Sequence, residues 1–392
     1  MSASQTRRIY LDHNATTPVH PEVFEAMLPY YKDKFGNASS IHSFGREAKV
    51  ALEESREQVA KFINADPGEI YFTSGGTESD NLAVKGTAFA NRKKGNHIIT
   101  SKIEHHAILE SCKVLEKEGF EVTYLPVDGQ GFVDPDDLKK AIRKETILVS
   151  LMHANNEVGT IEPVKEFCEI TKEKGAYFHT DAVQSVGKMP VDVQKLNVDM
   201  LSMSGHKIYG PKGVGAIYIR KGTRITSWSH GGHHERSRRA GTENVPGVVG
   251  LAKTVEIAQR DMEEQSRHMR NLSETFYQKL TQAIPDVILN GHLGKRIPNT
   301  LNLSFKAVEG ESVILSLDLK GVAVASGSAC TSGTLEPSHV LSAMGISPEI
   351  AQGAIRFSFG RGNTMEDVEY VIGILPEIVS RLRAMSPLYV NK

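Results

Sequence analysis

The sequence predicts an α/β fold in which a mainly parallel sheet is covered by helices, followed by a smaller α+β domain. Short β-branched runs alternate with amphipathic stretches over about the first 260 residues, and strands separated by helices are typical of βαβ units. The chain has 392 residues. Because a single hydrophobic core stops growing at about 250–300 residues, we expect two unequal lobes.

Six segments are predicted as strands of the large sheet. Each is a short apolar or β-branched run, and several end in a cluster of Gly, Ser, Thr, Asn or Asp. In open α/β sheets, ligands bind beyond the carboxyl ends of the strands, so we expect these clusters to converge on one site. A helix is predicted over 46–63, because Leu52, Val59 and Phe62 recur on one face. The predicted strands are 69–73, 97–100, 147–152, 176–179, 200–202 and 215–220.

The sequence pattern changes after about residue 250. A long charged helix is predicted over 256–280, followed by the strand-like PNTLNLSF and further helices. We predict an N-terminal segment (1–15) that packs on the small domain, a large domain (16–260) and a small domain (261–392). No repeat or low-complexity linker separates them, so the lobes are expected to pack tightly.

Charge and cysteine content limit the class of protein. There are 46 Lys+Arg and 47 Asp+Glu, a net charge of −1, which argues against nucleic-acid binding through a basic face and against a polybasic membrane anchor. No apolar run reaches the roughly 20 residues of a spanning helix, and MSASQTRRIYLDHN has no secretory apolar core. Cys112, Cys168 and Cys330 form no CxxC pair, and an odd, sparse count is typical of a reducing compartment. We therefore expect a cytoplasmic enzyme.

The segment TSGGTESD, residues 73–80, is a candidate phosphate site. It follows a predicted strand and opens a helix. Gly75 and Gly76 permit a sharp turn with exposed N–H groups, and the helix N-terminus adds partial positive charge. A plain turn with a capping box from Thr77 to Asp80 is the alternative. GxxxxGK[ST] is absent, which disfavours a nucleoside triphosphate.

Asp181, Gln184 and Lys207 follow two neighbouring predicted strands. The carboxylate of Asp181 is placed either to meet a ligand cation or to cap the next helix. A lysine in a Ser/Gly/His loop is usually solvated, but a desolvated one forms Schiff bases with carbonyls. A phosphate site, an acid for a pyridinium nitrogen and such a lysine are the three parts that a pyridoxal phosphate enzyme needs. Their order along one sheet favours this cofactor.

Three further side chains are candidates for chemistry. His105 follows a strand and could stack on a ring and relay protons, or be satisfied structurally. Cys330 lies among small residues in ASGSACTSG, which favours a mobile, accessible loop with a reactive thiol, whereas Cys112 and Cys168 are expected to be inert core residues. Arg356 could bind a substrate carboxylate or form a structural ion pair. The histidines of SHGGHHER have no second ligand cluster, so we expect no metal site.

Taken together, TSGGTESDNLA, MHANNEVG, HTDAVQSVGK, SGHKIYGPKGVG, HGGHHERSRRAGT and SGSACTSG resemble the motifs of NifS/IscS-type cysteine desulfurases. The resemblance runs from YLDHNATTP to IRFSFGR and covers nearly the whole chain. It implies the aminotransferase-like fold of fold type I pyridoxal phosphate enzymes, in a homodimer with active sites near the subunit interface. The segment around Cys330 resembles the longer loop of the housekeeping and nitrogen-fixation type.

The resemblance also implies roles for individual residues. Lys207 would hold the cofactor covalently, Asp181 would pair with its ring nitrogen, and His105 would stack on the ring. Arg356 would bind the substrate carboxylate, and Cys330 would accept the sulfur. The remaining implied contacts are Gln184 at the phenolic oxygen, Asn156 beside it near the substrate carboxylate, Gly76, Thr77, Ser204 and His206 at the phosphate, and Thr242 contributed by the other subunit.

The implied reaction converts L-cysteine to L-alanine and leaves the sulfur on Cys330 as a persulfide. The implied acceptor is an iron–sulfur scaffold protein, with a transient cluster shared through Cys330. A free thiol has a pKa of about 8.5, so the site must promote its deprotonation, and His105 is the candidate partner. A selenocysteine lyase and an aminotransferase remain alternatives, the latter leaving Cys330 idle. A cofactor-free sulfur-relay scaffold is disfavoured because Lys207 and Asp181 occur together.

Overall fold

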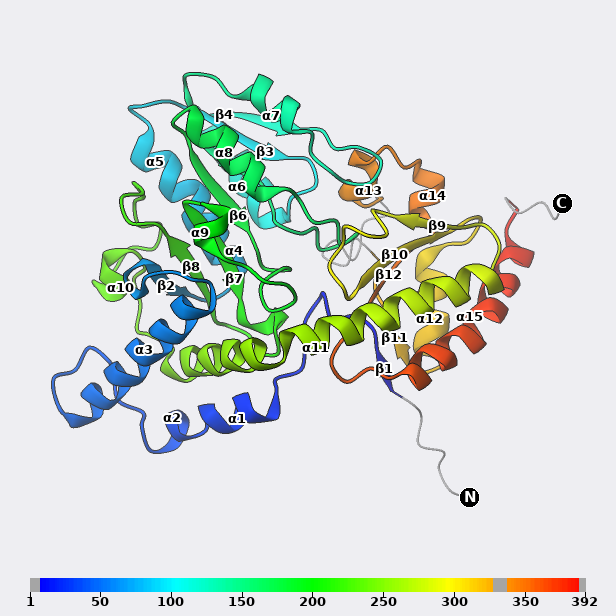
Figure 1. Ribbon diagram of the computed structural model, residues 1–392, viewed down its shortest axis with the longest axis horizontal. Helices are drawn as coiled ribbons and strands as arrows, with labels where there is room; N and C mark the ends of the chain where they lie inside the picture. Colours follow the sequence, from blue (N-terminus) through cyan, green and yellow to red (C-terminus); the bar gives the residue numbers. More distant parts are fainter. Residues whose placement is uncertain (1–7, 327–336, 388–392) are drawn as a thin grey trace.

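The computed structural model describes residues 8–326 and 337–387. Its main element is a seven-stranded sheet with helices on both faces (Figure 1). The strands are β2 (Ile70–Thr73), β3 (His97–Ser101), β4 (Glu121–Leu125), β5 (Thr146–Ser150), β6 (Tyr177–Asp181), β7 (Met200–Ser204) and β8 (Gly215–Ile219). Their order is β2-β8-β7-β6-β5-β3-β4, and only β8 runs antiparallel to its neighbours. The predicted α/β class with a mainly parallel sheet is confirmed.

All six predicted strands form, with ends shifted by a residue or two. Every residue of β5, β7 and β8 is buried, as expected for a sheet covered on both faces. The strand that the sequence did not predict is β4, which lies at the sheet edge beside β3. Its first four residues are only partly buried or exposed, so its hydrophobic signal is weak.

The helices of the first part of the chain surround this sheet. The predicted helix 46–63 is α3 (Ser43–Phe62). None of the helices within the described ranges is both long and apolar enough to cross a membrane. The others are α1 (Pro21–Met27), α2 (Pro29–Lys32), α4 (Gly76–Asn81), which continues through a π-turn into α5 (Thr87–Asn91), α6 (His106–Lys117), α7 (Pro135–Ala141), α8 (Val164–Glu173), α9 (Val193–Leu196) and α10 (His234–Ser237).

Helix α11 (Val245–Ala283) packs against α1 and α3 and, further along, against α15 (Met365–Met385) (Figure 1). It begins earlier than the predicted 256 because Val248, Leu251 and Val255 already form a buried face. The predicted division at residue 260 falls inside this helix, which continues through that position; the division stays a prediction.

The last part of the chain forms an antiparallel sheet in the order β12-β10-β9. Its core joins the end of α11 to this sheet and to α15, with Phe276, Leu303 and Phe357 fully buried. The N-terminal strand β1 (Ile9–Tyr10) pairs with β11 (Val322–Ala323). The remaining elements are β9 (Val287–Asn290), β10 (Thr300–Phe305), α12 (Gly310–Asp318), α13 (His339–Ala343), α14 (Pro348–Gln352) and β12 (Ala354–Ser358).

A buried ion pair fixes the segment that leads into α11. Arg56 of α3 donates to both carboxylate oxygens of Glu235, at 2.7 and 2.8 Å. Glu235, Arg236 and Ser237 have φ of 44°, 54° and 63°, a left-handed region that side chains rarely adopt. The pair therefore holds a strained segment in place, a few residues before Thr242.

Cys112 and Cys168 are buried, as predicted for inert core residues. Burial raises the pKa of each thiol to about 12, so neither forms a thiolate near neutral pH.

Candidate active site

A cavity of about 330 Å³ lies where several strands of the large sheet end. Its size is within the range of small-molecule sites. Asp181 ends β6, Ser204 ends β7, Gly76 begins α4 after β2, and His105 lies between β3 and α6, so the predicted convergence of these clusters is confirmed. The predicted residues that line the cavity are Gly76, Thr77, His105, Asn156, Asp181, Gln184, Ser204, His206, Lys207 and Arg356.

One end of the cavity is built from the start of α4 and the end of β7. Gly75 precedes the helix with φ of 150°. A Cβ on Gly76 would lie 2.7 Å from Cγ2 of Val183, so a larger residue there requires Val183 to move. The hydroxyl of Ser204 is buried without a hydrogen-bond partner among the described residues. An unpaired hydroxyl beside a helix N-terminus is suited to an anion such as a phosphate.

The amine of Lys207 is held by the N-terminal segment of the chain. Its Nζ donates to the carbonyl oxygens of Asn14 at 2.6 Å and Ala15 at 2.8 Å. Lys207 ends the short turn that follows β7, and both carbonyl-bearing residues also line the cavity. These contacts hold the amine at the wall of the cavity.

Three buried carboxyl groups lie near the cavity, and they differ in pKa. Burial raises the pKa of Asp181 to about 6, opposed by a hydrogen bond from Val183 N–H and by Lys207. Burial raises the pKa of Glu104 to about 8, and burial and Asp181 hold the pKa of Asp80 well above its usual value. At neutral pH Asp181 is therefore mostly ionised and Glu104 is mostly protonated.

Two sequence alternatives for these acids are settled by the local geometry. Asp181 does cap the turn that follows it, because its Oδ1 accepts from Val183 N at 2.8 Å, but it also lines the cavity. The capping box between Thr77 and Asp80 does not form. Gly75 is the residue that precedes α4, and the buried carboxyl of Asp80 lines the cavity, where its Oδ1 lies 3.8 Å from His179 Nε2 and has no hydrogen bond among the described residues.

Both histidines at the cavity are neutral. Burial, followed by the charge of Lys207, lowers the pKa of His105 to about 4. Its Nδ1 accepts from the backbone N–H of Ala107 at 3.1 Å, which leaves Nε2 protonated. Burial and Lys207 likewise lower the pKa of His206 to about 4. The cavity thus presents uncharged, flat imidazoles, as stacking on an aromatic ring requires.

Arg356 is buried, and two nitrogens of its guanidinium make hydrogen bonds within the protein. Nη2 donates to Asp12 at 2.8 Å, and Nη1 donates to the carbonyl oxygen of Asn156 at 3.0 Å. The ion pair proposed as the alternative for Arg356 is therefore present. The side chain still lines the cavity, and its Nε has no partner among the described residues.

Cys330 lies outside the described residues, but the chain on both sides of it is fixed beside the cavity. Ala325 exchanges two backbone hydrogen bonds with Arg356, at 2.7 and 3.3 Å. Ser338 donates to Glu157 Oε2 at 2.5 Å. Since Arg356 lines the cavity and Glu157 follows the lining residue Asn156, both flanks of the segment are anchored near it.

Several residues of the site were not predicted from the sequence. Asn14, Lys188, Asp80 and Glu104 were not predicted to take part. Lys188 follows Gln184 by four residues, a spacing that could have indicated a contact. Asn14 contacts partners more than a hundred positions away, so no periodic pattern could have revealed it. Thr242 is exposed and does not line the cavity of its own chain; its role remains a prediction.

Comparison with known proteins places the chain among characterised relatives. Residues 9–371 match the class-V aminotransferase family. The chain belongs to this family. Cysteine desulfurase IscS of Dictyoglomus turgidum is 58% identical, with 97% of each chain covered. Cysteine desulfurase IscS of Methanosarcina thermophila is 56% identical, with 98% of this chain and 95% of the relative covered.

Solved structures agree with this assignment. A NifS-like protein superposes with a TM-score of 0.91 at 43% identity, covering 96% of this chain and all of the other. SspA in complex with cysteine superposes with a TM-score of 0.79 at 36% identity, covering 91% and 100%. The chain is of the NifS/IscS cysteine desulfurase type, whose cofactor is pyridoxal phosphate. The unpaired Ser204 hydroxyl, the Asp181 carboxylate and the Lys207 amine fit this cofactor.

Glu104→Gln tests the assignment of the buried proton. Burial raises the pKa of Glu104 in the folded protein to about 8. Between about pH 5 and that value the folded state therefore binds more protons than the unfolded state. The free energy of unfolding falls as the pH rises through this window. Glutamine carries no such proton. The variant is expected to melt higher than the parent at about pH 8, with the difference shrinking toward about pH 5.

The matched control is Glu54→Gln, at an exposed glutamate of α3. It is expected to leave the pH dependence of the melting temperature unchanged. A Glu104→Gln variant that melts lower than the parent at every pH would contradict the assignment.

Proposed function

We propose that this protein is a cysteine desulfurase that converts L-cysteine to L-alanine and carries the sulfur as a persulfide on Cys330. The observation that carries the proposal is a single cavity. It is lined by the Lys207 amine, by the Asp181 carboxylate, and by Gly76 at the start of α4 and Ser204 at the end of β7, which form the end suited to an anion. The anchored flanks of the Cys330 segment lie beside that cavity. Relatives named cysteine desulfurase at 56–58% identity, and a structural neighbour solved with cysteine, support it.

Each end of the cavity has a separate role in holding the cofactor. Lys207 would form the covalent attachment, and Asp181 would pair with the ring nitrogen, where a carboxylate favours the protonated form. His105 would stack on the ring, and Gln184 would donate to the phenolic oxygen. Gly76, Thr77, Ser204 and His206 would hold the phosphate, with Thr242 supplied by the other subunit. When bound, pyridoxal phosphate supplies a ring that accepts the electron pair released at the substrate Cα.

The substrate is bound and deprotonated by residues of this chain. Arg356, with Asn156 beside it, binds the carboxylate of L-cysteine. The free Lys207 amine would take the proton from Cα of the bound substrate. Its position under the Asn14 and Ala15 carbonyls keeps it at the cavity wall between these steps.

Sulfur transfer requires the Cys330 thiolate at the same cavity. Its Sγ forms a bond to the substrate sulfur while the bond from that sulfur to Cβ breaks. The electron pair of the broken bond remains on Cβ, which takes up a proton and becomes the methyl group of alanine. Cys330 lies five residues after Ala325 and eight before Ser338. At up to about 3.5 Å per residue, the tether from Ala325 spans at most about 17 Å.

The persulfide is then available to a second protein. We propose an iron–sulfur scaffold as the acceptor, with a transient cluster shared through Cys330, because the relatives carry the name IscS. The small residues that flank Cys330 in the sequence favour a thiol that such a partner can reach. The sparse cysteines favour a cytoplasmic location.

An exposed apolar surface at the α1–α3 end of the molecule supports a homodimer. We call Phe24, Tyr31, Phe35, Ile41 and Phe44 the aromatic patch; Phe35 is 67% and Ile41 is 91% exposed. Large exposed apolar surfaces mark interaction sites. We propose a second copy as the partner, because Arg56 ties α3, which carries Phe44 of this patch, to the segment that leads to Thr242, the residue expected to act at the other subunit's cavity.

Cys330→Ala is expected to keep the visible absorption of the cofactor but to release no sulfide from L-cysteine. The parent protein incubated with L-cysteine is expected to gain the mass of one sulfur atom in intact-mass analysis, and the variant none. Full sulfide release by Cys330→Ala would refute the role of this thiol.

Lys207→Ala is expected to abolish alanine production, because the variant has neither the covalent attachment nor the amine that removes the Cα proton. Loss of a covalent catalytic group typically lowers turnover by about 10⁴-fold or more. Alanine formed by the variant at the rate of the parent would overturn the assignment.

Phe35→Asp combined with Ile41→Asp is expected to convert the dimer to a monomer in sedimentation velocity, because two charges would have to be buried in the interface. The control Leu319→Asp changes a leucine that is 84% exposed, just after α12, and should leave the dimer intact. An unchanged dimer in the double variant would place the interface elsewhere.

A further inference from the structure

Lys188 is a fully buried lysine behind the wall of the candidate active site. Its residue is 5% exposed, and its Nζ donates to Gln184 Oε1 at 2.7 Å and to Asn14 Oδ1 at 3.2 Å. Two consecutive turns follow Asp181. In the first, Ser185 and Val186 donate to Ala182 O, and in the second, Lys188 N donates to Ser185 O. These turns bring the Lys188 side chain back toward Gln184. No salt bridge to Lys188 occurs within residues 8–326 and 337–387.

The contact determines which way the Gln184 amide faces. The Lys188 amine donates in this contact, so the atom of Gln184 that receives it is the carbonyl oxygen. The amide nitrogen is then directed away from Lys188. One of its N–H groups donates to Asn14 O at 3.1 Å, and the second is left for the cavity that Gln184 lines. Burial holds the pKa of Lys188 well below its usual value, but even the neutral amine has the two N–H groups that these contacts need.

The same network reaches the amine of Lys207. The Asn14 carbonyl oxygen accepts from Gln184 and from Lys207 together, so a rotation of the Gln184 amide would alter both contacts. The charged groups around Lys188 are Lys207 and Arg356, and the titratable ring of His13 lies on its other side. Burial lowers the pKa of His13 to about 4, so that ring stays neutral near neutral pH.

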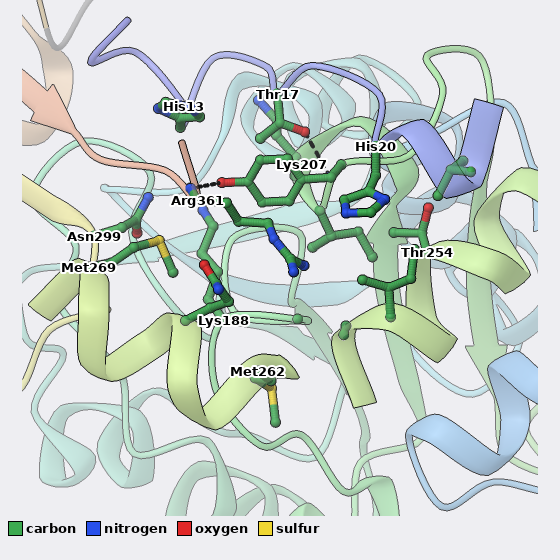
Figure 2. Close-up of a pocket in the computed structure, with 17 residues that line it drawn as sticks. His13, Thr17, His20, Lys188, Lys207, Thr254, Met262, Met269, Asn299 and Arg361 are labelled. Carbon is green, nitrogen blue, oxygen red and sulfur yellow. Dashed lines mark hydrogen bonds between the residues drawn. The ribbon is translucent and has the colours of Figure 1, made fainter. Parts of the chain in front are cut away.

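On the side away from the active site, Lys188 borders a small cavity of about 30 Å³ (Figure 2). His13, Lys207 and Asn299 lie around it (Figure 2). The cavity has room for about two water molecules, and Gln265 Oε1 in its wall is buried without a partner among the described residues. Lys188 therefore has polar surroundings on both sides, which is how a buried amine is accommodated.

We propose that Lys188 is a positioning residue: through the oxygen of Gln184 it holds the amide N–H toward the phenolic oxygen of the cofactor, beside the Lys207 nitrogen. The inference rests on the function proposed above. It assigns to Lys188 no contact with cofactor or substrate.

The test is the pH midpoint of the visible absorbance of the bound cofactor, which reports protonation of the nitrogen shared with Lys207. An amide N–H donated to the phenolic oxygen withdraws charge from it, so a loss of this bond favours the protonated nitrogen. Lys188→Met is expected to raise the midpoint by about one pH unit. The exposed Lys93→Met is the control and should leave it unchanged.

A double-mutant cycle separates positioning from a direct effect of charge. In a Gln184→Ala background there is no amide to orient, so Lys188→Met is expected to move the midpoint by less than half as much. The full shift in that background would show that Lys188 acts by its own charge and would overturn the proposal, as would no shift in the parent background.

Folding and cofactor content are checked by circular dichroism and by the phosphate content of each variant. If Lys188→Met does not fold, Lys188→Gln replaces it, because the shorter polar side chain does not reach both amide oxygens. This variant is expected to shift the midpoint in the same direction. An unshifted midpoint in Lys188→Gln contradicts the proposal. A parent protein without a pH-dependent chromophore would instead contradict the proposed function itself.

Discussion

The active site depends on one residue of the N-terminal segment, Asn14, whose backbone and side chain join parts of the chain that are far apart. Its carbonyl oxygen positions the Lys207 amine. A segment that leaves β1, crosses to the large sheet and ends in α1 thus becomes a wall of the cavity. Removal of this segment would take the Asn14 and Ala15 carbonyl oxygens from Lys207 and the Asn14 side-chain oxygen from Lys188. The other hydrogen bonds of Asn14 are to Gln184, Lys188, Asn299, Thr300, the hydroxyl of Ser358 and the carbonyl oxygen of Asn156.

The charges at the cavity are distributed by burial. Lys207 and Arg356 line the cavity together with Asp181, which is mostly ionised near neutral pH, whereas Glu104 is mostly protonated. Arg356 is paired with Asp12. The Lys207 amine and the Nε of Arg356, which has no partner among the described residues, offer donors to anions, as a phosphate ester and an amino acid carboxylate both are. The neutral His105 ring leaves a flat surface between these charges.

The sequence predicts much of this arrangement because its signals are local. β6 and β7 are largely buried runs, Asp181 is the last residue of β6, and Lys207 lies in the turn after β7, so placement at one sheet edge follows from the βαβ pattern. The edge strand β4 was not predicted, because a half-exposed strand has weak hydrophobic periodicity. The early start of α11 was not predicted either, because a helix start that contains glycines also has weak periodicity. Asn14 and Glu104 were not predicted for a different reason. Their importance comes from burial and from contacts across the fold, which no spacing in the chain encodes.

The central claim is that the amine held by Asn14 and Ala15 is the one that binds the cofactor covalently. Lys188 lies in the same hydrogen-bond network and is the natural competitor. Borohydride reduction of the protein loaded with pyridoxal phosphate, followed by proteolysis and mass mapping, identifies the modified lysine. The account predicts one pyridoxyl group, on Lys207; a group on Lys188, or no modified lysine at the cavity, would contradict it.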